Sequence, residues 1–338
     1  MIKKILLYTF FTMILVVVGS VSIGYYFLHQ FSKQQINVTN QNEIFILKKG
    51  TSLNQLIEQV KQSNLLEQVY LLPYLYKLDP KLSSIKAGTY QLHPHMTVAD
   101  FLKLLVSGKE NNFSIKFVEG KRAKDWLKVI RNSPYITQTL KDKSNEEIAQ
   151  ILGIEGSLEG WLSPNTYLYT AETSDINLLK RAHLTMKSNL QKVWDNRDKD
   201  LPYNTPYELL IIASIIEKET SLSSERANVA SVFVNRLRAK MKLQTDPTII
   251  YGLGDKYTGK IRRIDITDTN NPYNTYVIQG LPPTPIAMPS LASLEAAAHP
   301  ANTDYLFFVA NGTGGHTFSS NYSNHQKAVN EYRRKMNK

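Results

Sequence analysis

The chain has 338 residues, 42% of them hydrophobic and 10% aromatic, which is enough for about two globular domains. It contains no cysteine, which excludes disulfides, a cysteine nucleophile, iron-sulfur clusters and thiolate zinc sites. The 40 basic and 29 acidic side chains give a formal charge of +11, compatible with a nucleic acid, a membrane surface or an acidic polymer as partner.

The amino-terminal segment from Ile5 to Leu28 is a run of 24 residues without a charged side chain, and two lysines precede it. As a helix it would measure about 36 Å, enough to cross a hydrocarbon core of about 30 Å. A cleaved signal peptide is the alternative, but its apolar region should be only about 7 to 15 residues long. We therefore predict a transmembrane helix at 5–28. The positive-inside rule places residues 1–4 in the cytoplasm and the body of the chain across the membrane.

A small domain is predicted at 43–109, after a polar tether at 29–42 that is rich in Gln, Asn and Ser. The apolar patterns predict the order strand, helix, helix, strand, helix. The strands are expected at 43–47 and 86–92, and the helices from Thr51 or Ser52, over 65–78 and from Thr97. The stretch Phe-x-Leu-x-x-Gly-Thr-Ser-Leu resembles the opening of a LysM-type peptidoglycan-binding module. A small α+β domain that binds nothing is the alternative.

A second domain is predicted at 110–338, after a polar break at 107–112. A strand is expected at 113–118, and helical patterns dominate from there to about residue 240. The last hundred residues are rich in Pro, Gly and Asn, so we expect loops with a few short strands, such as 305–310. The predicted fold class is α+β, with a transmembrane helix, a LysM-like domain and a mainly helical larger domain.

The clearest local signal is a capping box at Thr205, with proline at the first helical position. Seven of the eight residues at 209–216 are apolar, so this helix should be buried around its whole circumference. The last turn of this helix carries Glu217, which directly follows the apolar run, so its carboxyl group should lie at the edge of an apolar interior. Apolar neighbours and the negative end of the helix dipole both favour the neutral acid, which suits a general acid.

The neighbours of Glu217 allow two interpretations. Ser214, one turn earlier, is small and leaves space for a ligand against the carboxyl group. Glu219 should face elsewhere, as a solvated or ion-paired side chain. The alternative is that Glu217 is an ordinary helix-end glutamate paired with an arginine such as Arg226. A further helix is expected after Ser224 as its N-cap, with Glu225 in its first turn.

Several polar, turn-rich segments mix amides, hydroxyls and aromatic rings, the mixture that suits sugar recognition. Amides and hydroxyls can bond sugar hydroxyl and acetamido groups, while flat rings cover the apolar sugar face. The candidate substrate-binding residues are Ser214, Glu159, Trp161, Asn235, Gln244, Thr245, Asp246, Tyr273, Asn274 and Tyr276. The alternative is that these residues have only structural roles, because Tyr and Trp side chains usually pack in the core and Asn is common in turns.

Other kinds of site find little support in the sequence. The seven histidines have no metal-ligand spacing, so we expect no metal and no cofactor. The basic residues are dispersed along a chain predicted to lie outside the cytoplasm, which argues against nucleic acid as a partner.

Five blocks resemble the endolytic murein transglycosylase family (MltG, or YceG-like). They are ASIIEKET at 213–220, ASVFVNRL at 230–237, LQTDPT at 243–248, YNTY at 273–276 and GLPP at 280–283. The resemblance covers roughly the whole chain, and it implies that Glu217 corresponds to the family's single catalytic glutamate. In one departure, Asn165 stands where the family often has Asp, so this chain lacks a carboxylate there.

The resemblance implies a lyase that cuts the β-1,4 bond between N-acetylmuramic acid and N-acetylglucosamine within nascent strands, leaving 1,6-anhydro ends. Glu217 would protonate the leaving oxygen and then accept the proton of the muramyl 6-hydroxyl. Ordinary glycosidases need a second carboxylate, which this scheme does not. The implied setting is the bacterial inner membrane, with the body in the periplasm or outside, glycan strands as substrate and a peptidoglycan synthase as partner. A non-catalytic peptidoglycan-binding scaffold and a lysozyme-like hydrolase are the alternatives.

Overall fold

The computed structural model describes residues 2–40 and 43–336. The chain divides into two compact units, of which the first runs as far as Phe113 and adds Leu168–Ala171, while the second holds the remaining residues. This division falls within four residues of the predicted domain boundary after Lys109. Helices combine with small two-stranded sheets, so the α+β class is confirmed.

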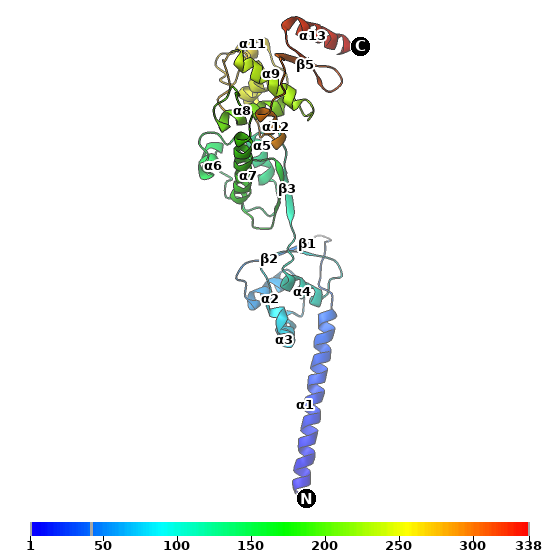
Figure 1. The fold of residues 1–338 in the computed structure, drawn as a ribbon. Coiled ribbons are helices and arrows are strands. Elements are labelled where there is room, and N and C mark those ends of the chain that lie inside the picture. Colours follow the sequence, from blue (N-terminus) through cyan, green and yellow to red (C-terminus); the bar gives the residue numbers. More distant parts are fainter. Residues whose placement is uncertain (1, 41–42, 337–338) are drawn as a thin grey trace. The chain divides into compact units, whose positions relative to one another are not determined.

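The first unit has the predicted order of elements (Figure 1). Its elements are α1 (Ile2–Lys33), β1 (Glu43–Leu47), α2 (Leu53–Gln62), the 3₁₀ helix η1 (Val69–Leu71), α3 (Leu72–Leu78), the 3₁₀ helix η2 (Pro80–Ser83), β2 (Gly88–Leu92) and α4 (Val98–Ser107). Capping boxes at Ser52 and Thr97 start α2 and α4, as the sequence predicts. The strands pair antiparallel, with Glu43 opposite Leu92. The helix expected over 65–78 is shorter, since its first turns are irregular and 3₁₀.

The segment predicted as a tether is largely ordered in the structure. Helix α1 continues to Lys33, and Phe31 and Ile36 are buried in the core of the first unit. The Ile36 N–H donates to the Met96 carbonyl at 2.9 Å. Burial of each such side chain contributes about 1.5–3 kcal/mol, enough to hold this segment against the unit. Residues 41 and 42 lie outside the described part.

Helix α1 is the one helix in the described part of the chain that is long and apolar enough to cross a membrane. It includes the whole segment 5–28. Its window of highest hydropathy is not buried against any other part of the protein.

The second unit is mainly helical (Figure 1). The elements from Phe113 on are β3 (Phe113–Phe117), α5 (Ala123–Arg131), α6 (Asn145–Ile151), β4 (Asn165–Tyr169), α7 (Asp175–Asp195), α8 (Pro206–Glu219), α9 (Arg226–Arg238), α10 (Asp246–Leu253), the 3₁₀ helix η3 (Gly254–Lys256), α11 (Arg263–Thr267), α12 (Leu291–Ala298), β5 (Phe307–Ala310), β6 (His316–Ser319) and α13 (Tyr322–Met336). Strands β3 and β4 form one sheet, and β5 and β6 form an antiparallel hairpin.

Two expectations about this unit need correction. The last hundred residues contain the expected loops and short strands, but they also contain four helices, α10, α11, α12 and α13, that the sequence analysis did not predict. Helix α12 is only eight residues long and starts at the N-cap Ser290, whose hydroxyl accepts from the Ser293 N–H. The N-cap of α9 is Glu225 and not Ser224, so the helix begins one residue later than expected, at Arg226, and Glu225 makes no side-chain capping bond.

Helix α8 is the centre of the second unit, in contact with α7, α9, α10 and α12 (Figure 1). Its predicted capping box is present: Thr205 Oγ1 accepts from the Glu208 N–H at 3.2 Å, and Glu208 Oε2 accepts from the Thr205 N–H at 3.2 Å. Every residue from 209 to 216 is buried, as the apolar pattern predicts. The helix therefore presents Glu217 at the edge of the core.

Candidate active site

Glu217 lies at the amino-terminal end of α12. Its Oε2 atom accepts three hydrogen bonds: from the Ser290 N–H at 2.9 Å, from the Ser290 hydroxyl at 2.5 Å and from the Ser293 hydroxyl at 2.7 Å. Among the described residues, all the hydrogen bonds that Glu217 accepts go to this one oxygen. Its other oxygen, Oε1, is therefore left for a ligand.

This environment differs from the apolar one expected from the sequence. The groups around the Glu217 Oε2 atom are hydrogen-bond donors at the start of a helix, not apolar side chains. The proposed pairing with Arg226 is wrong, because the Arg226 guanidinium donates instead to the Ser221 carbonyl at 3.4 Å. Glu217 is thus held by neutral donors and not neutralised by a cation.

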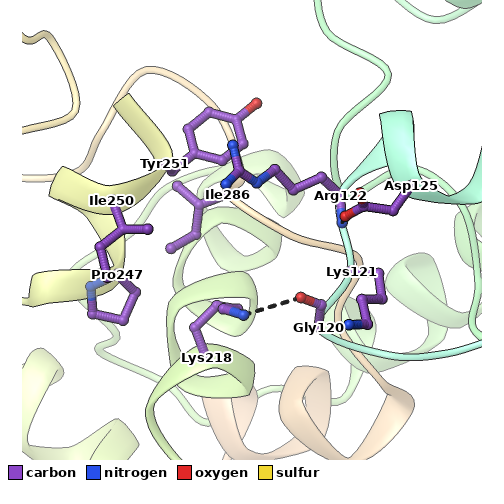
Figure 2. Close-up of a pocket in the computed structure, with 9 residues that line it drawn as sticks. All are labelled: Gly120, Lys121, Arg122, Asp125, Lys218, Pro247, Ile250, Tyr251 and Ile286. Carbon is purple, nitrogen blue, oxygen red and sulfur yellow. Dashed lines mark hydrogen bonds between the residues drawn. The ribbon is translucent and has the colours of Figure 1, made fainter. Parts of the chain in front are cut away.

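A cavity of about 410 Å³ is lined by Lys218, the residue after Glu217, and by Gly120 (Figure 2). Its lining comes from the turn before α5, from α5 itself, from α8, from α10 and from the segment before α12: Gly120, Lys121, Arg122, Asp125, Lys218, Pro247, Ile250, Tyr251 and Ile286. The glycine in this lining lies against the candidate acid, since a Cβ built on Gly120 would be 3.8 Å from Glu217 Cγ. A side chain at this position would narrow the space beside the carboxyl group.

Glu159 lies behind the cavity wall and is 4% exposed. Its carboxylate accepts from the Ala123 N–H at 3.0 Å and from the Tyr251 hydroxyl at 3.2 Å. Burial raises the pKa of Glu159 to about 7, although the two hydrogen bonds and the nearby Arg122 oppose that rise. Glu159 therefore ties the start of α5 to α10, and it reaches the cavity only through Tyr251.

Glu219 is neither solvated nor ion-paired, contrary to the expectation. Its side chain is only partly buried as a whole, but its carboxyl group is strongly desolvated and accepts a hydrogen bond from the Thr245 hydroxyl. Burial and the nearby Asp246 raise the pKa of Glu219 to about 7, while His316 and Arg236 act in the opposite direction. It belongs to a polar cluster on the other side of α8.

Three of the predicted binding residues are occupied by structural hydrogen bonds. Ser214 is fully buried, and its hydroxyl donates to the Ile211 carbonyl at 2.7 Å and accepts from the Ile286 N–H at 3.0 Å. Fully buried Asn274 uses its amide to close the loop that follows α11, bonding three carbonyls of residues 265–268. Asn235 donates to carbonyls of residues 303 and 305. The Ser214 hydroxyl and the amide nitrogens of Asn235 and Asn274 are therefore engaged with the backbone.

Four further predicted residues lie together around the start of α10, in the cluster that holds Glu219. Gln244 Oε1 accepts from Arg236 at 3.3 Å, and the Thr245 hydroxyl bonds Glu219. The Tyr276 hydroxyl donates to Asp246 at 2.7 Å. Gln244 and Asp246 are exposed, so this part of the cluster remains accessible.

The other two predicted aromatic residues, Trp161 and Tyr273, line or contact the lining of a second cavity of about 680 Å³. Trp161 lines it, stacked on Tyr207 with ring centroids 5.9 Å apart, and its buried Nε1–H has no partner in the described part of the chain. Tyr273 contacts Tyr251 edge-on at 4.8 Å and bonds Thr284 at 2.9 Å. Since Tyr251 lines the first cavity and Thr284 the second, Tyr273 lies between them.

The sequence analysis missed the residues that hold Glu217 and surround its cavity. Ser290 could have been predicted as a helix N-cap, because it precedes the helix-forming run Leu-Ala-Ser-Leu-Glu-Ala-Ala-Ala, and Ser293 lies in the first turn of that run. Lys121 and Arg122 had no local signal. Asn165, the departure from the family pattern, is exposed at the start of β4, and its side chain accepts from the Thr166 N–H at 2.7 Å.

Fold and site together define a protein with one candidate acid-base carboxylate at the edge of a helical core, beside an open polar cavity. The chain belongs to the YceG-like family, whose model matches residues 45–331. The resemblance noted in the sequence is thereby confirmed.

Relatives and a solved structure agree with this assignment. The chain is 28% identical over 336 residues to the endolytic murein transglycosylase of Bacillus subtilis, covering 94% of this chain and 91% of that protein. It is 26% identical to the endolytic murein transglycosylase of Streptococcus pneumoniae, of which it spans 64%. The crystal structure of a yceG-like protein from Listeria monocytogenes matches with a TM-score of 0.56 and 27% identity, over 85% of this chain and 98% of that one.

Proposed function

We propose that this chain is an endolytic peptidoglycan transglycosylase, a lyase in which Glu217 is the only acid-base catalyst. The observation that carries the proposal is the asymmetric hydrogen bonding of its carboxyl group. Three donors hold Oε2, no hydrogen bond among the described residues goes to Oε1, and Gly120, which lines the cavity, lies against the Glu217 side chain. The relatives named endolytic murein transglycosylases indicate the substrate class.

The proposed reaction has two proton transfers through Oε1. Glu217 first donates its proton to the glycosidic oxygen as the bond between that oxygen and C1 of N-acetylmuramic acid breaks. The 6-hydroxyl oxygen of the same sugar then forms a bond to C1, and its proton passes back to Glu217. The products are a 1,6-anhydro end and a free 4-hydroxyl on N-acetylglucosamine, so no water is consumed.

The position of α12 supports this chemistry. Protonating the leaving oxygen converts Glu217 from a neutral acid to a carboxylate, and the three donors at the helix start stabilise that negative charge. The same charge is what the group needs when it accepts the 6-hydroxyl proton. General acid-base assistance of this kind contributes about 10² to 10⁴ in rate.

The test uses the full chain in detergent with purified peptidoglycan sacculi, and it analyses the ends of the released glycan. We expect anhydro ends from the wild type and none from Glu217→Gln. Glu208→Gln, at the opposite end of the same helix, is the matched control and should remain active, because glutamine also completes a capping box. Reducing ends would identify a hydrolase instead, and intact glycan with retained binding would identify a scaffold.

We also propose that α1 anchors the protein in the cytoplasmic membrane, with the body outside the cytoplasm. The length and hydropathy of α1 and the two lysines before Ile5 support this orientation. The antiparallel β1–β2 pair with α2 and α3 between its strands supports a LysM-like role in glycan binding for the first unit. A reporter enzyme fused after Lys338 should be active only outside the cytoplasm, and activity inside would contradict the orientation.

A further inference from the structure

The cavity beside Glu217 is lined by three cations, Lys121, Arg122 and Lys218 (Figure 2). None of the three forms an ion pair with any described residue. One acid, Asp125, also lines the cavity, and its Oδ2 accepts from the Arg122 N–H at 3.2 Å. The lining therefore carries an excess of two positive charges.

The three cations are close enough to repel one another. The pKa of Lys218 is lowered, first by burial and then by the positive charges of Lys121 and Arg122. Glu217 and Asp125 offset this only in part, and among the described residues Glu217 hydrogen-bonds only to the two serines. An anion in the cavity would relieve this repulsion and make charge-assisted hydrogen bonds.

The cations differ in how firmly they are held. Lys218 Nζ donates to the Gly120 carbonyl at 3.2 Å, as Figure 2 shows. The Arg122 guanidinium lies 5.6 Å from the centre of the Tyr251 ring, a cation–π distance. Lys121, which is exposed like Lys218, has no side-chain hydrogen bond to any described residue. Two cations thus have defined positions, and the third can adapt to a ligand.

We propose that this cavity binds a carboxylate of the peptide branch of the glycan strand and so makes the enzyme select peptide-bearing sugars next to the bond that it cuts. The inference rests on the proposed function for the identity of the strand. The repeating sugars are uncharged once the lactyl group is amide-linked to peptide, so they would not require three cations. The carboxylates of the peptide branch are the anions that the same strand brings near the muramyl sugar.

The test compares two forms of the same soluble glycan strands, one with peptides and one from which an amidase has removed them. The measured quantity is the ratio of kcat/KM for peptide-bearing strands to kcat/KM for peptide-free strands, with anhydro ends as the readout. Lys121→Gln in the full chain should lower this ratio roughly three- to tenfold, the effect of one lost charge-assisted contact. Lys121→Arg, which keeps the charge, should restore most of it.

Lys128→Gln is the matched control, because Lys128 is exposed on α5 and does not line the cavity. It removes the same charge and should leave the ratio unchanged. An equal loss on both substrates in Lys121→Gln, or no loss on either, would overturn the proposal. A third outcome is a wild type that cuts both forms of strand equally well and whose activity is inhibited by free phosphate or pyrophosphate. It would assign the cavity to a phosphate and would also overturn the proposal.

A binding measurement separates this proposal from the proposed function. Glu217→Gln is used because it should bind the glycan without cutting it. Its affinity for the two forms of strand is measured with and without Lys121→Gln. Lys121-dependent preference for peptide-bearing strands, together with a wild type that releases no anhydro ends, would support the cavity and contradict the transglycosylase. Cutting that depends on Glu217, without any such preference, would support the transglycosylase and contradict the cavity.

Discussion

Ser290 donates to the same oxygen of Glu217 twice, from its backbone N–H at 2.9 Å and from its hydroxyl at 2.5 Å. The same hydroxyl also accepts from the Ser293 N–H at 3.2 Å, so one side chain caps α12 and orients the candidate catalyst. The position of Glu217 therefore depends on the start of a helix that lies more than seventy residues further along the chain.

Ser290→Ala should lower kcat by about 10- to 100-fold, since a hydrogen bond to a charged group contributes about 1.5–3 kcal/mol. The backbone N–H remains, so some activity should persist. Loss of the cap should also lower the free energy of unfolding by about 1 kcal/mol. Both quantities are measured on the same preparation, by release of anhydro ends and by denaturant unfolding.

Ser144→Ala provides the control, because Ser144 caps α6 in the same way, accepting from the Glu147 N–H at 3.2 Å. It should cost similar stability and leave kcat unchanged. If Ser144→Ala lowers kcat as much as Ser290→Ala does, the effect is one of stability and the contact with Glu217 has no catalytic role.

The features that the sequence predicts well are local ones. Helix α8 could be predicted because a capping box precedes a run of apolar residues. Glu217 could be chosen as the candidate catalyst because it follows that run and lies in the block ASIIEKET at 213–220. The surroundings of Glu217 could not, because Ser290, Gly120 and Tyr251 come from distant parts of the chain. No local pattern reports which segments meet.

The mistaken expectations have the same origin. The polar composition of residues 29–42 predicts a tether, but the two apolar residues Phe31 and Ile36 find a core to enter. The two-residue spacing from Glu217 predicts Glu219 in solvent, but Thr245 and Asp246 enclose its carboxyl group on that other face of α8. Tertiary contacts override both local signals.

The protein should become less stable as the pH rises from about 5 to 8, and Glu159 should account for part of this loss. Burial raises its pKa from the ordinary 4.5 to about 7. Between these values the folded state binds more protons than the unfolded state, so the free energy of unfolding falls as pH rises. Glu159→Gln should therefore reduce the difference in this free energy between pH 5 and pH 8 by about 1–3 kcal/mol.

Thermal or denaturant unfolding at the two pH values measures this effect. Glu219 contributes a fall of the same sign, so the variant should keep some pH dependence. Glu146→Gln, at an exposed position on α6, should follow the wild type. If the free energy of unfolding of Glu159→Gln falls between pH 5 and pH 8 as much as that of the wild type, Glu159 does not bind an extra proton in the folded state.

Arg236 should contribute strongly to stability through its guanidinium. It is 8% exposed, and it donates to the carbonyls of Leu306 at 2.7 Å and Leu243 at 2.9 Å and to Gln244 Oε1 at 3.3 Å. Lysine cannot reach these acceptors together, so Arg236→Lys should lower the free energy of unfolding by about 2–4 kcal/mol. Arg238→Lys, on the exposed side of α9, should change it by less than about 0.5 kcal/mol. Similar denaturant midpoints for the two variants would contradict this role.

Gly160, between Glu159 and Trp161, should not tolerate a side chain. Its φ is +83°, and a Cβ would lie 2.6 Å from both Cβ and Cγ of Pro285, closer than atoms can approach without a shift of the backbone. Gly153 has a similar φ of +73° with no atom within 4 Å of the added Cβ, so Gly153→Ala measures the backbone strain alone, about 1–2 kcal/mol. Gly160→Ala should lose at least twice as much stability in denaturant unfolding, because the clash adds to the strain. Equal losses in the two variants would show that the segment around Pro285 can yield, and that it does not rigidly position Glu159.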